Sequence, residues 1–406
     1  MIQNLADLLA PMTPAQFFAE YHDRQPLHLK GGAAKFASVL SWRQLNRLLD
    51  MTHIWSSQSL KLVMDEKPVP AEQYCAPATG RDALAVQQPV AAQVMDWIKR
   101  GASLALNDVD SLTPGLTAVS EALEGAGLGK AQANVYVSWQ AHKAFPSHFD
   151  THDVWAVQVE GEKAWNIWEG RADYPIASPI FRNLGQAHHD QAKGRLRERL
   201  VLQTGDLLYL PRGWYHDALC EGPATMHVAF GVHAPLGMDV LNMLLERAMY
   251  EPLFRQPLPR QDGSAAARFA LTSRAGQLGQ KLAELARDPK VMQVLEGFVA
   301  SWHYQRGGMD VLAARGLAGG GGGAGGEEAL GFRVLVPGAR PVRRGAEWVL
   351  KAPGGSVTLS PAEAEAATWL LGRADVTEAE LQAAHPQVAA AGLLGRLAGA
   401  GLLVAA

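Results

Sequence analysis

The side chains in this sequence that are best suited to bind a metal ion are two imidazoles and a carboxylate. His148-Phe-Asp150 is a His-x-Asp pair, and alternate residues of a strand face the same side, so both could bind one ion. His216 follows a glycine turn, an apolar run and a Pro-Arg-Gly turn. Two imidazoles and one carboxylate on one face of an ion leave adjacent coordination sites open, as in non-haem Fe(II) oxygenases. Spacing alone leaves a purely structural role for these histidines equally open.

A second motif of the same type, His188-His189-Asp190, shows that His-x-Asp by itself is weak evidence. The chain has 13 histidines, so chance occurrences are expected. The second motif lies in a polar segment without a strand signal, and we expect a solvated loop there that binds no metal. The first motif lies between a predicted strand and an apolar run, at the lip of a predicted barrel, where ligands commonly bind.

Short strands are the elements that would position the first motif. Runs rich in β-branched and aromatic residues predict strands over 134–138, 154–159, 164–168, 207–210 and 226–232. Because helical segments do not alternate with these strands, they predict an antiparallel barrel or sandwich. The first 130 residues are predicted to be mostly helical, with helix starts at Thr13-Pro14 and at Ser41.

Beyond residue 233 the strand signals stop. Apolar residues at helical spacing predict helices over 238–254 and 265–287, and a run of glycines over 316–326 is typical of a flexible linker. The final segment follows a helix–helix–helix–strand pattern, with helices beginning near Ser360, Thr377 and Val388. That pattern predicts a small winged-helix-like unit.

Composition narrows the classes of protein that this sequence can encode. A length of 406 residues suggests two or three domains. The net charge of -3 disfavours a protein held to nucleic acid mainly by phosphate contacts. Two cysteines fit a reducing compartment, the N-terminus lacks the basic region of a signal peptide, and no apolar run is long enough to span a membrane. We therefore expect a cytoplasmic protein without a membrane partner.

Four sequence blocks together resemble the JmjC/cupin-4 oxygenases, which include the bacterial and human ribosomal oxygenases. The blocks are Asn134-Val-Tyr136, Pro-Ser-His148-Phe-Asp150, Gln158 to Trp165, and Gly205 to His216. The resemblance implies an α+β architecture that begins with a double-stranded β-helix, the cupin or JmjC jelly-roll barrel, with N-terminal helices over residues 1–235. A helical dimerisation region over 236–315, a glycine-rich linker over 316–328 and a winged-helix-like domain over 329–406 would follow.

The resemblance also implies the ligands of the site. His148, Asp150 and His216 would bind Fe(II), and Lys163 would pair with the distal carboxylate of the cosubstrate 2-oxoglutarate, with O2 as the second cosubstrate. A dicarboxylate that chelates iron through its 2-oxo acid end has a second charge inside the barrel, and that charge must be paired. Judged without the resemblance, Lys163 in Glu-Gly-Glu-Lys is more typical of a solvated strand end.

Other positions match the family pattern less securely. Asn134 and Tyr136 match polar positions of the cosubstrate pocket, although core packing would explain them equally well. Ala229 stands where the family often has a Thr or Ser hydroxyl. His152 is an additional histidine beside the first motif, for which an exposed position with satisfied hydrogen bonds is expected. Trp139, Trp155 and Trp214 lie near the expected barrel mouth and are expected to be core residues.

The resemblance implies a 2-oxoglutarate-dependent oxygenase that hydroxylates a protein side chain, with a ribosomal protein as the type of substrate and a homodimer as the assembly. The same chemistry on a peptide natural product or a small molecule is an alternative. A non-enzymatic DNA-binding regulator with a vestigial cupin is another. Residues 329–406 hold seven basic and six acidic side chains, so direct nucleic-acid binding is not expected.

Overall fold

The structure is a computed structural model, which describes residues 2–79, 85–139, 145–220, 222–307, 331–344, 347–352 and 355–405. The glycine-rich linker expected over 316–328 lies outside the described residues. No helix within the described ranges combines the length and apolar character needed to cross a membrane.

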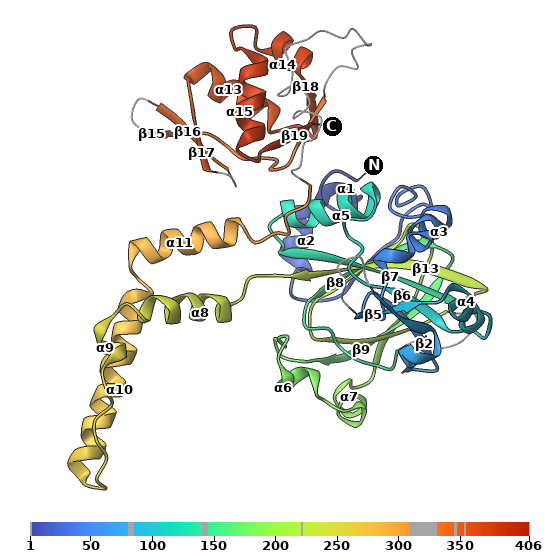
Figure 1. Ribbon diagram of the computed structural model, residues 1–406, viewed down its shortest axis with the longest axis horizontal. Coiled ribbons are helices and arrows are strands. Elements are labelled where there is room, and N and C mark those ends of the chain that lie inside the picture. Colours follow the sequence, from blue (N-terminus) through green and yellow to red (C-terminus); the bar gives the residue numbers. More distant parts are fainter. Residues whose placement is uncertain are drawn as a thin grey trace.

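Two antiparallel sheets face each other and enclose a barrel (Figure 1). The larger sheet has the order β1-β11-β8-β13-β7-β6-β2-β3 and the smaller has the order β10-β9-β12. The strands of the larger sheet are β1 (Leu27–Leu29), β2 (Leu60–Met64), β3 (Lys67–Pro68), β6 (Ser103–Leu106), β7 (Lys130–Trp139), β8 (Asp153–Glu160), β11 (Leu207–Leu210) and β13 (Ala224–His233). The smaller sheet contains β9 (Lys163–Arg171), β10 (Leu196–Leu202) and β12 (Trp214–Leu219). A separate hairpin pairs β4 (Cys75–Thr79) with β5 (Ala85–Pro89).

Residue alternation along the strands divides the apolar side chains between two cores. Val154 and Ala156 of β8 point into the barrel, where they pack with Trp165 and Ile167 of β9. Trp155, between them, faces outward and belongs to the core beneath the N-terminal helices. Because successive residues of a strand face opposite sides, one set of side chains lines the barrel interior, where the site lies. The other set packs in the core on the outer face and stabilises the fold.

Helices from the first half of the chain cover the outer face of the larger sheet. They are α1 (Leu5–Leu9), α2 (Pro14–Glu20), α3 (Trp42–Asp50), α4 (Ala91–Lys99) and α5 (Pro114–Gly125), with single 3-10 turns η1 (Thr52–Ile54) and η2 (Ala71–Gln73). The ring of Phe17 in α2 contacts Trp155 in a tilted arrangement and Tyr209 edge-to-face, with ring centroids 5.0 and 4.9 Å away. The helix starts expected at Thr13 and Ser41 are confirmed, and each residue forms a capping box with the glutamine three positions later.

The expectation of a mostly helical N-terminal region is wrong in part. This region also contributes β1, β2, β3 and β6 to the larger sheet. β1 has only three residues, and all four residues of β6 are buried, so neither shows the alternation of a half-buried strand. Short apolar runs of this kind cannot be distinguished from helix by periodicity.

All five strands predicted in the barrel are confirmed, but two strands of the smaller sheet, β10 and β12, were not predicted. β10 is Leu-Arg-Glu-Arg-Leu-Val-Leu and mostly exposed, and β12 begins immediately after the Pro-Arg-Gly turn. Residues expected to form a solvated loop around His188 instead form the helix α7 (Gln186–Ala192), which follows the short helix α6 (Pro179–Arg182). Both helices lie in the connection between β9 and β10.

A helical arm, residues 237–300, extends away from the barrel (Figure 1). It consists of α8 (Gly237–Ala248), α9 (Pro252–Arg255), α10 (Ala265–Leu285) and α11 (Pro289–Ala300). Its own buried core is small and contains Leu244, Ala248 and Leu285. The indole of Trp302, just after the arm, donates to the carbonyl of His233 at 2.7 Å, so both ends of the arm meet at the end of β13.

The C-terminal unit has a core of its own and two small sheets, ordered β18-β14-β19 and β15-β16-β17. Its strands are β14 (Gly331–Val334), β15 (Val342–Arg344), β16 (Glu347–Ala352), β17 (Gly355–Leu359), β18 (Asp375–Thr377) and β19 (Leu403–Ala405). Its helices are α13 (Pro361–Leu370), α14 (Glu378–Ala384) and α15 (Ala390–Gly399). The helix starts expected at Ser360 and Thr377 are confirmed, with a capping box at each.

Candidate metal centre

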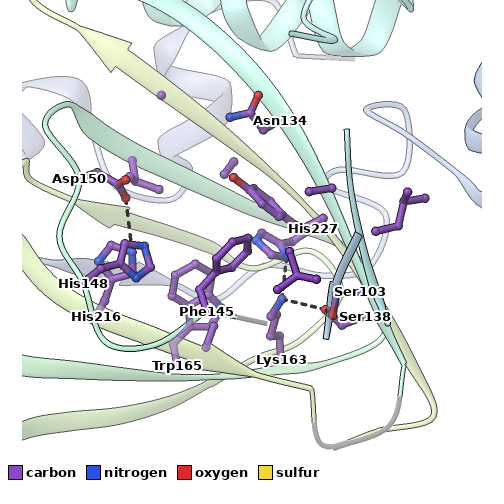
Figure 2. Close-up of a pocket in the computed structure, with 18 of the residues that line it drawn as sticks. Ser103, Asn134, Ser138, Phe145, His148, Asp150, Lys163, Trp165, His216 and His227 are labelled. Carbon is purple, nitrogen blue, oxygen red and sulfur yellow. Dashed lines mark hydrogen bonds and ion pairs between the residues drawn. The ribbon is translucent and has the colours of Figure 1, made fainter. Parts of the chain in front are cut away.

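Three of the predicted site residues meet inside the barrel. His148, Asp150 and His216 each offer a ligand atom, and these atoms lie within 4.8 Å of one another. The Nε2 atom of His216 is 3.5 Å from a carboxylate oxygen of Asp150, and the two imidazole centroids are 4.6 Å apart (Figure 2). Among the described residues this is the only His/Cys/Asp/Glu group with such a geometry. Its donor set matches the facial triad that binds Fe(II).

Backbone carbonyls orient both imidazoles for metal binding. The Nδ1 atom of His148 lies 2.8 Å from the carbonyl oxygen of Pro146, and Nδ1 of His216 lies 2.9 Å from that of Trp214. A carbonyl oxygen only accepts hydrogen bonds, so each Nδ1 carries the proton and each Nε2 keeps a free lone pair. The unprotonated nitrogens are therefore available to an ion.

The chain segment that carries the first motif is fixed to β12 by backbone hydrogen bonds. His148 and His216 form a two-residue antiparallel bridge, in which each amide donates to the other carbonyl, at 3.0 and 2.9 Å. The amide of Gly213 donates to the carbonyl of Asp150 at 2.8 Å. Residues far apart in the sequence thus reach one site through main-chain pairing.

Local electrostatics keep Asp150 and His216 in the protonation states that a cation needs. Burial alone would raise the pKa of Asp150, but the facing imidazoles of His152, His148, His216 and His233 outweigh it and lower the pKa. Burial, aided by the neighbouring His148, lowers the pKa of His216 to about 4. At neutral pH the site presents a carboxylate and a neutral imidazole to a metal ion.

A cavity of about 200 Å³ extends from the triad into the barrel. Its walls come from β6, β7, β8, β9, β12 and β13, and the triad and Lys163 both line it (Figure 2). Pockets for drug-sized ligands hold roughly 300–1,000 Å³, so this cavity suits a smaller molecule.

Lys163 begins β9 inside the barrel rather than at a solvated strand end, with only 3% of its surface exposed. Its ammonium lies 3.5 Å from the hydroxyl of Ser138 and 3.5 Å from Nδ1 of His227. Within the described part of the chain, no carboxylate pairs with it. Burial accordingly lowers the pKa of Lys163 to about 8. A buried cation without a counter-charge is costly, and an anionic ligand would remove that cost.

His227 is a pocket residue that the sequence reasoning missed. It stacks on Tyr136, with centroids 5.1 Å apart, and burial followed by the nearby Lys163 charge keeps its pKa well below the ordinary value. A neutral imidazole can accept a hydrogen bond from the Lys163 ammonium. The alternation of His227, Ala229 and Gly231 along β13 could have indicated that these three residues share the inward face.

Asn134 and Tyr136 also line the cavity, on β7 opposite Ala229 and His227. The amide oxygen of Asn134 accepts a hydrogen bond from the backbone N–H of Asp108 at 3.1 Å, and its side chain also hydrogen-bonds Tyr136. Burial raises the pKa of Tyr136 to about 12, so its phenol remains protonated. Both residues therefore have hydrogen-bond partners within the protein and also line the cavity.

Of the histidine and tryptophan residues considered near the barrel mouth, one lines the cavity and the others belong to or pack against the core. His152 lines the cavity beside Asp150, and its ring occupies the space that a side chain at Gly231 would need, 2.8 Å from the position of a Cβ atom there. Trp155 and Trp214 are buried core residues, and Trp139 packs against the core. His152 is thus less exposed to solvent than expected.

The second His-x-Asp motif lies on α7, where no third ligand joins it within the described residues. Nδ1 of His189 contacts the hydroxyl of Tyr215 at 3.3 Å, and Asp190 pairs with Lys193 at 3.0 Å. These residues lie on the outer side of the segment that contains His148 and Asp150.

Comparison with known proteins agrees with this geometry. A family model described as the JmjC domain matches residues 117–240. This part of the barrel matches a JmjC domain. These residues comprise β7 to β13 and include all three triad residues and Lys163.

Curated relatives of this chain are named as a demethylase and histidyl-hydroxylase or as a ribosomal oxygenase. A protein of Drosophila persimilis, the bifunctional lysine-specific demethylase and histidyl-hydroxylase NO66, is 27% identical over 57% of this chain and 32% of its own length. Ribosomal oxygenase 1 of Gallus gallus is 25% identical over 69% of this chain and 47% of its own length. The chain thus spans less than half the length of these relatives.

Solved structures similar to this chain include YcfD of Escherichia coli. One such structure has a TM-score of 0.56 at 16% identity and covers 98% of this chain and 99% of the other. Another, described as a ribosomal oxygenase in complex with cobalt and 2-oxoglutarate, has a TM-score of 0.54 at 16% identity, with 97% and 98% coverage. The likeness establishes the fold, a JmjC cupin barrel with added helices.

Proposed function

We propose that this protein is an Fe(II)- and 2-oxoglutarate-dependent oxygenase that hydroxylates a protein side chain. The observation that carries the proposal is the cavity with the triad at one part of its wall and the buried, carboxylate-free ammonium of Lys163 at another. The triad is suited to bind a metal ion, and the Lys163 ammonium is suited to bind an anion. The names of the relatives and the 2-oxoglutarate complex of YcfD support the same reaction class.

The donor atoms fit Fe(II). His148 and His216 supply unprotonated Nε2 atoms and Asp150 supplies a carboxylate, which leaves coordination positions for a chelating 2-oxo acid and O2. Bound iron with these cosubstrates supplies the oxidation of a C–H bond, coupled to conversion of 2-oxoglutarate to succinate and carbon dioxide.

The far part of the cavity fits the distal carboxylate of 2-oxoglutarate. Lys163 provides the charge, and Ser138 and His227 hold its ammonium. The indole N–H of Trp165, also in the cavity wall, has no partner among the described residues and is a further available donor. Ala229 contributes no hydroxyl, so we assign the polar contacts at this side of the cavity to Asn134 and Tyr136.

The substrate we propose is a side chain of a ribosomal protein, because relatives from several animals are named ribosomal oxygenases or histidyl-hydroxylases. The test is mass spectrometry of ribosomal proteins from cells with and without the gene. We expect one peptide to lose the mass of a single oxygen atom in the deletion strain. If ribosomal proteins are unchanged while the purified enzyme still converts 2-oxoglutarate, the substrate belongs to another class, such as a small molecule.

We further propose that the helical region, residues 236–315, pairs two chains and that residues 329–406 form a winged-helix-like domain. Apolar side chains of the arm remain exposed after the arm has formed its own core: Leu241, Leu245, Met249, Tyr250, Phe269, Val294 and Val299. Phe269 is 76% exposed. An apolar surface of this kind commonly marks an interface.

A dimer is therefore the expected species in sedimentation at micromolar concentration. Leu245→Glu combined with Phe269→Glu should shift the protein toward monomer, because charged side chains would be desolvated at the interface. Lys61→Glu, on an exposed position of β2, is the matched control and should leave the dimer intact. A parent protein that sediments as a monomer would contradict the assignment of the arm.

A further inference from the structure

Asp217 lies next to the site histidine His216 in β12 and is 1% exposed. Adjacent residues of a strand face opposite sides, so His216 points into the cavity and Asp217 points to the outer face of the smaller sheet. Three donors converge on its carboxylate: Ser147 Oγ at 2.6 Å, Asn166 Nδ2 at 2.9 Å and Trp168 Nε1 at 2.8 Å. The proposed metal chemistry makes no use of this buried carboxylate.

Ser147 precedes His148, and Asp217 follows His216. Because the bridge between the two histidines is antiparallel, Ser147 and Asp217 lie opposite each other. The bridge between His148 and His216 aligns the two segments, and the bond from Ser147 to Asp217 joins the neighbouring side chains on the outer side. The cavity side of the bridge carries two metal ligands, and the outer side carries this short hydrogen bond. Side-chain interactions are therefore available on both faces of the His148–His216 bridge, the cavity face and the outer face.

Helix α7 adds two contacts to Ser147, which is 3% exposed. The side-chain amide of Gln186 donates to its carbonyl oxygen at 3.1 Å, and the ammonium of Lys193, just beyond the helix, donates to its hydroxyl at 3.2 Å. The hydroxyl therefore donates to Asp217 and accepts from Lys193.

We propose that Asp217 is a positioning residue for the metal centre, which acts through Ser147 to hold His148 at its working distance from His216. The inference rests on the proposed function in one respect, that the triad binds a metal ion. Two backbone hydrogen bonds alone tie His148 to β12 on the cavity side. The clamp formed by Asp217, Ser147, Gln186 and Lys193 prevents that bridge from opening.

Loss of the clamp should weaken metal binding more than it weakens folding. Asp217→Ala leaves the Ser147 hydroxyl, the Asn166 amide and the Trp168 indole without their acceptor and frees the Ser147 segment to shift. Removal of groups that orient metal ligands costs on the order of 10- to 100-fold in metal affinity. Asp217→Asn retains one acceptor oxygen and should fall between Asp217→Ala and the parent. Ser147→Ala removes the hydroxyl contacts to Asp217 and Lys193 but keeps the backbone bond from Gln186, so it should weaken affinity several-fold.

The experiment is a Co(II) titration of the full-length protein, followed by visible absorption, with a thermal unfolding curve for each variant. Asp206→Ala is the matched control because Asp206 is also a buried carboxylate, 3% exposed. It accepts from His28 Nε2 and from the amide of Gly31, each at 2.9 Å, and it does not line the cavity. It should lower the melting temperature and leave the Co(II) dissociation constant unchanged.

The inference is supported if Asp217→Ala and Ser147→Ala raise the Co(II) dissociation constant, Asp217→Asn restores part of the affinity and Asp206→Ala has no effect. If Asp217→Ala does not fold, Asp217→Asn and Ser147→Ala carry the same comparison. Parental affinity in these variants, or an equal loss in Asp206→Ala, would overturn it. Failure of the parent to bind Co(II), or parental binding by His148→Ala, would instead overturn the metal site itself.

Discussion

His148→Ala and His216→Ala should each abolish 2-oxoglutarate turnover, and His188→Ala should retain the parental rate. Each of the first two changes removes one of three protein ligands, and no other His, Cys, Asp or Glu among the described residues joins this group. Since the loss of an outer partner alone costs about 10- to 100-fold in metal affinity, loss of a ligand should cost more than about 100-fold. His188 lies on the exposed surface of α7.

The measurement is succinate formation at saturating Fe(II) and 2-oxoglutarate, together with the Co(II) affinity of each variant. His188→Ala is the matched control because it removes an imidazole from the same sequence motif. Loss of turnover in His188→Ala with full activity in His148→Ala would reverse the assignment of the two motifs.

Lys163→Ala should raise the concentration of 2-oxoglutarate needed for half-maximal rate by about 10- to 100-fold or more. A charge-assisted hydrogen bond is worth about 1.5–3 kcal/mol, and each 1.4 kcal/mol corresponds to a tenfold change in affinity. The variant also leaves the distal carboxylate without a counter-charge in a buried pocket. Metal affinity should remain parental because the triad is unchanged. Equal 2-oxoglutarate binding by Lys163→Ala and the parent would contradict the pocket assignment.

The pH dependence offers a second test of the same lysine. Burial lowers the pKa of Lys163 to about 8 in the free protein, so the ammonium that attracts the dicarboxylate is lost as the pH rises through that value. Affinity for 2-oxoglutarate should therefore be highest below pH 8 and fall above it, because binding above that pH requires uptake of a proton. Lys163→Arg keeps its charge, so it should retain part of the affinity and lose this decline. The measurement is 2-oxoglutarate binding at several pH values with Co(II) in place of iron.

The site could be predicted from the sequence where a motif and a strand signal coincide. His148 and Asp150 lie between two predicted strands, and His216 follows a predicted strand and a Pro-Arg-Gly turn; the structure brings the three together. Lys163 was predicted through the spacing of a family pattern, since Glu-Gly-Glu-Lys by itself favours a solvent-exposed strand end. The roles of these residues stay proposals that the variants above test.

What could not be predicted depends on pairing between distant segments. His227 reaches Lys163 because β13 pairs with β7 and β8, and single-strand periodicity does not indicate which strands are neighbours. Asp217 and Ser147 are 70 positions apart and meet only through the bridge at His148. β1 and β6 were missed because a three-residue strand and a fully buried strand show no alternation.

We propose that one cavity holds Fe(II) on the triad and 2-oxoglutarate between that metal and Lys163. The most direct test is an anaerobic titration of the iron-loaded protein with 2-oxoglutarate, followed by the charge-transfer absorption that arises when a 2-oxo acid chelates Fe(II). We predict one such complex per chain, no absorption from His148→Ala, and the parental band at about 10- to 100-fold higher 2-oxoglutarate in Lys163→Ala. Absence of the band from the parent protein, or an undiminished band in His148→Ala, would contradict the account.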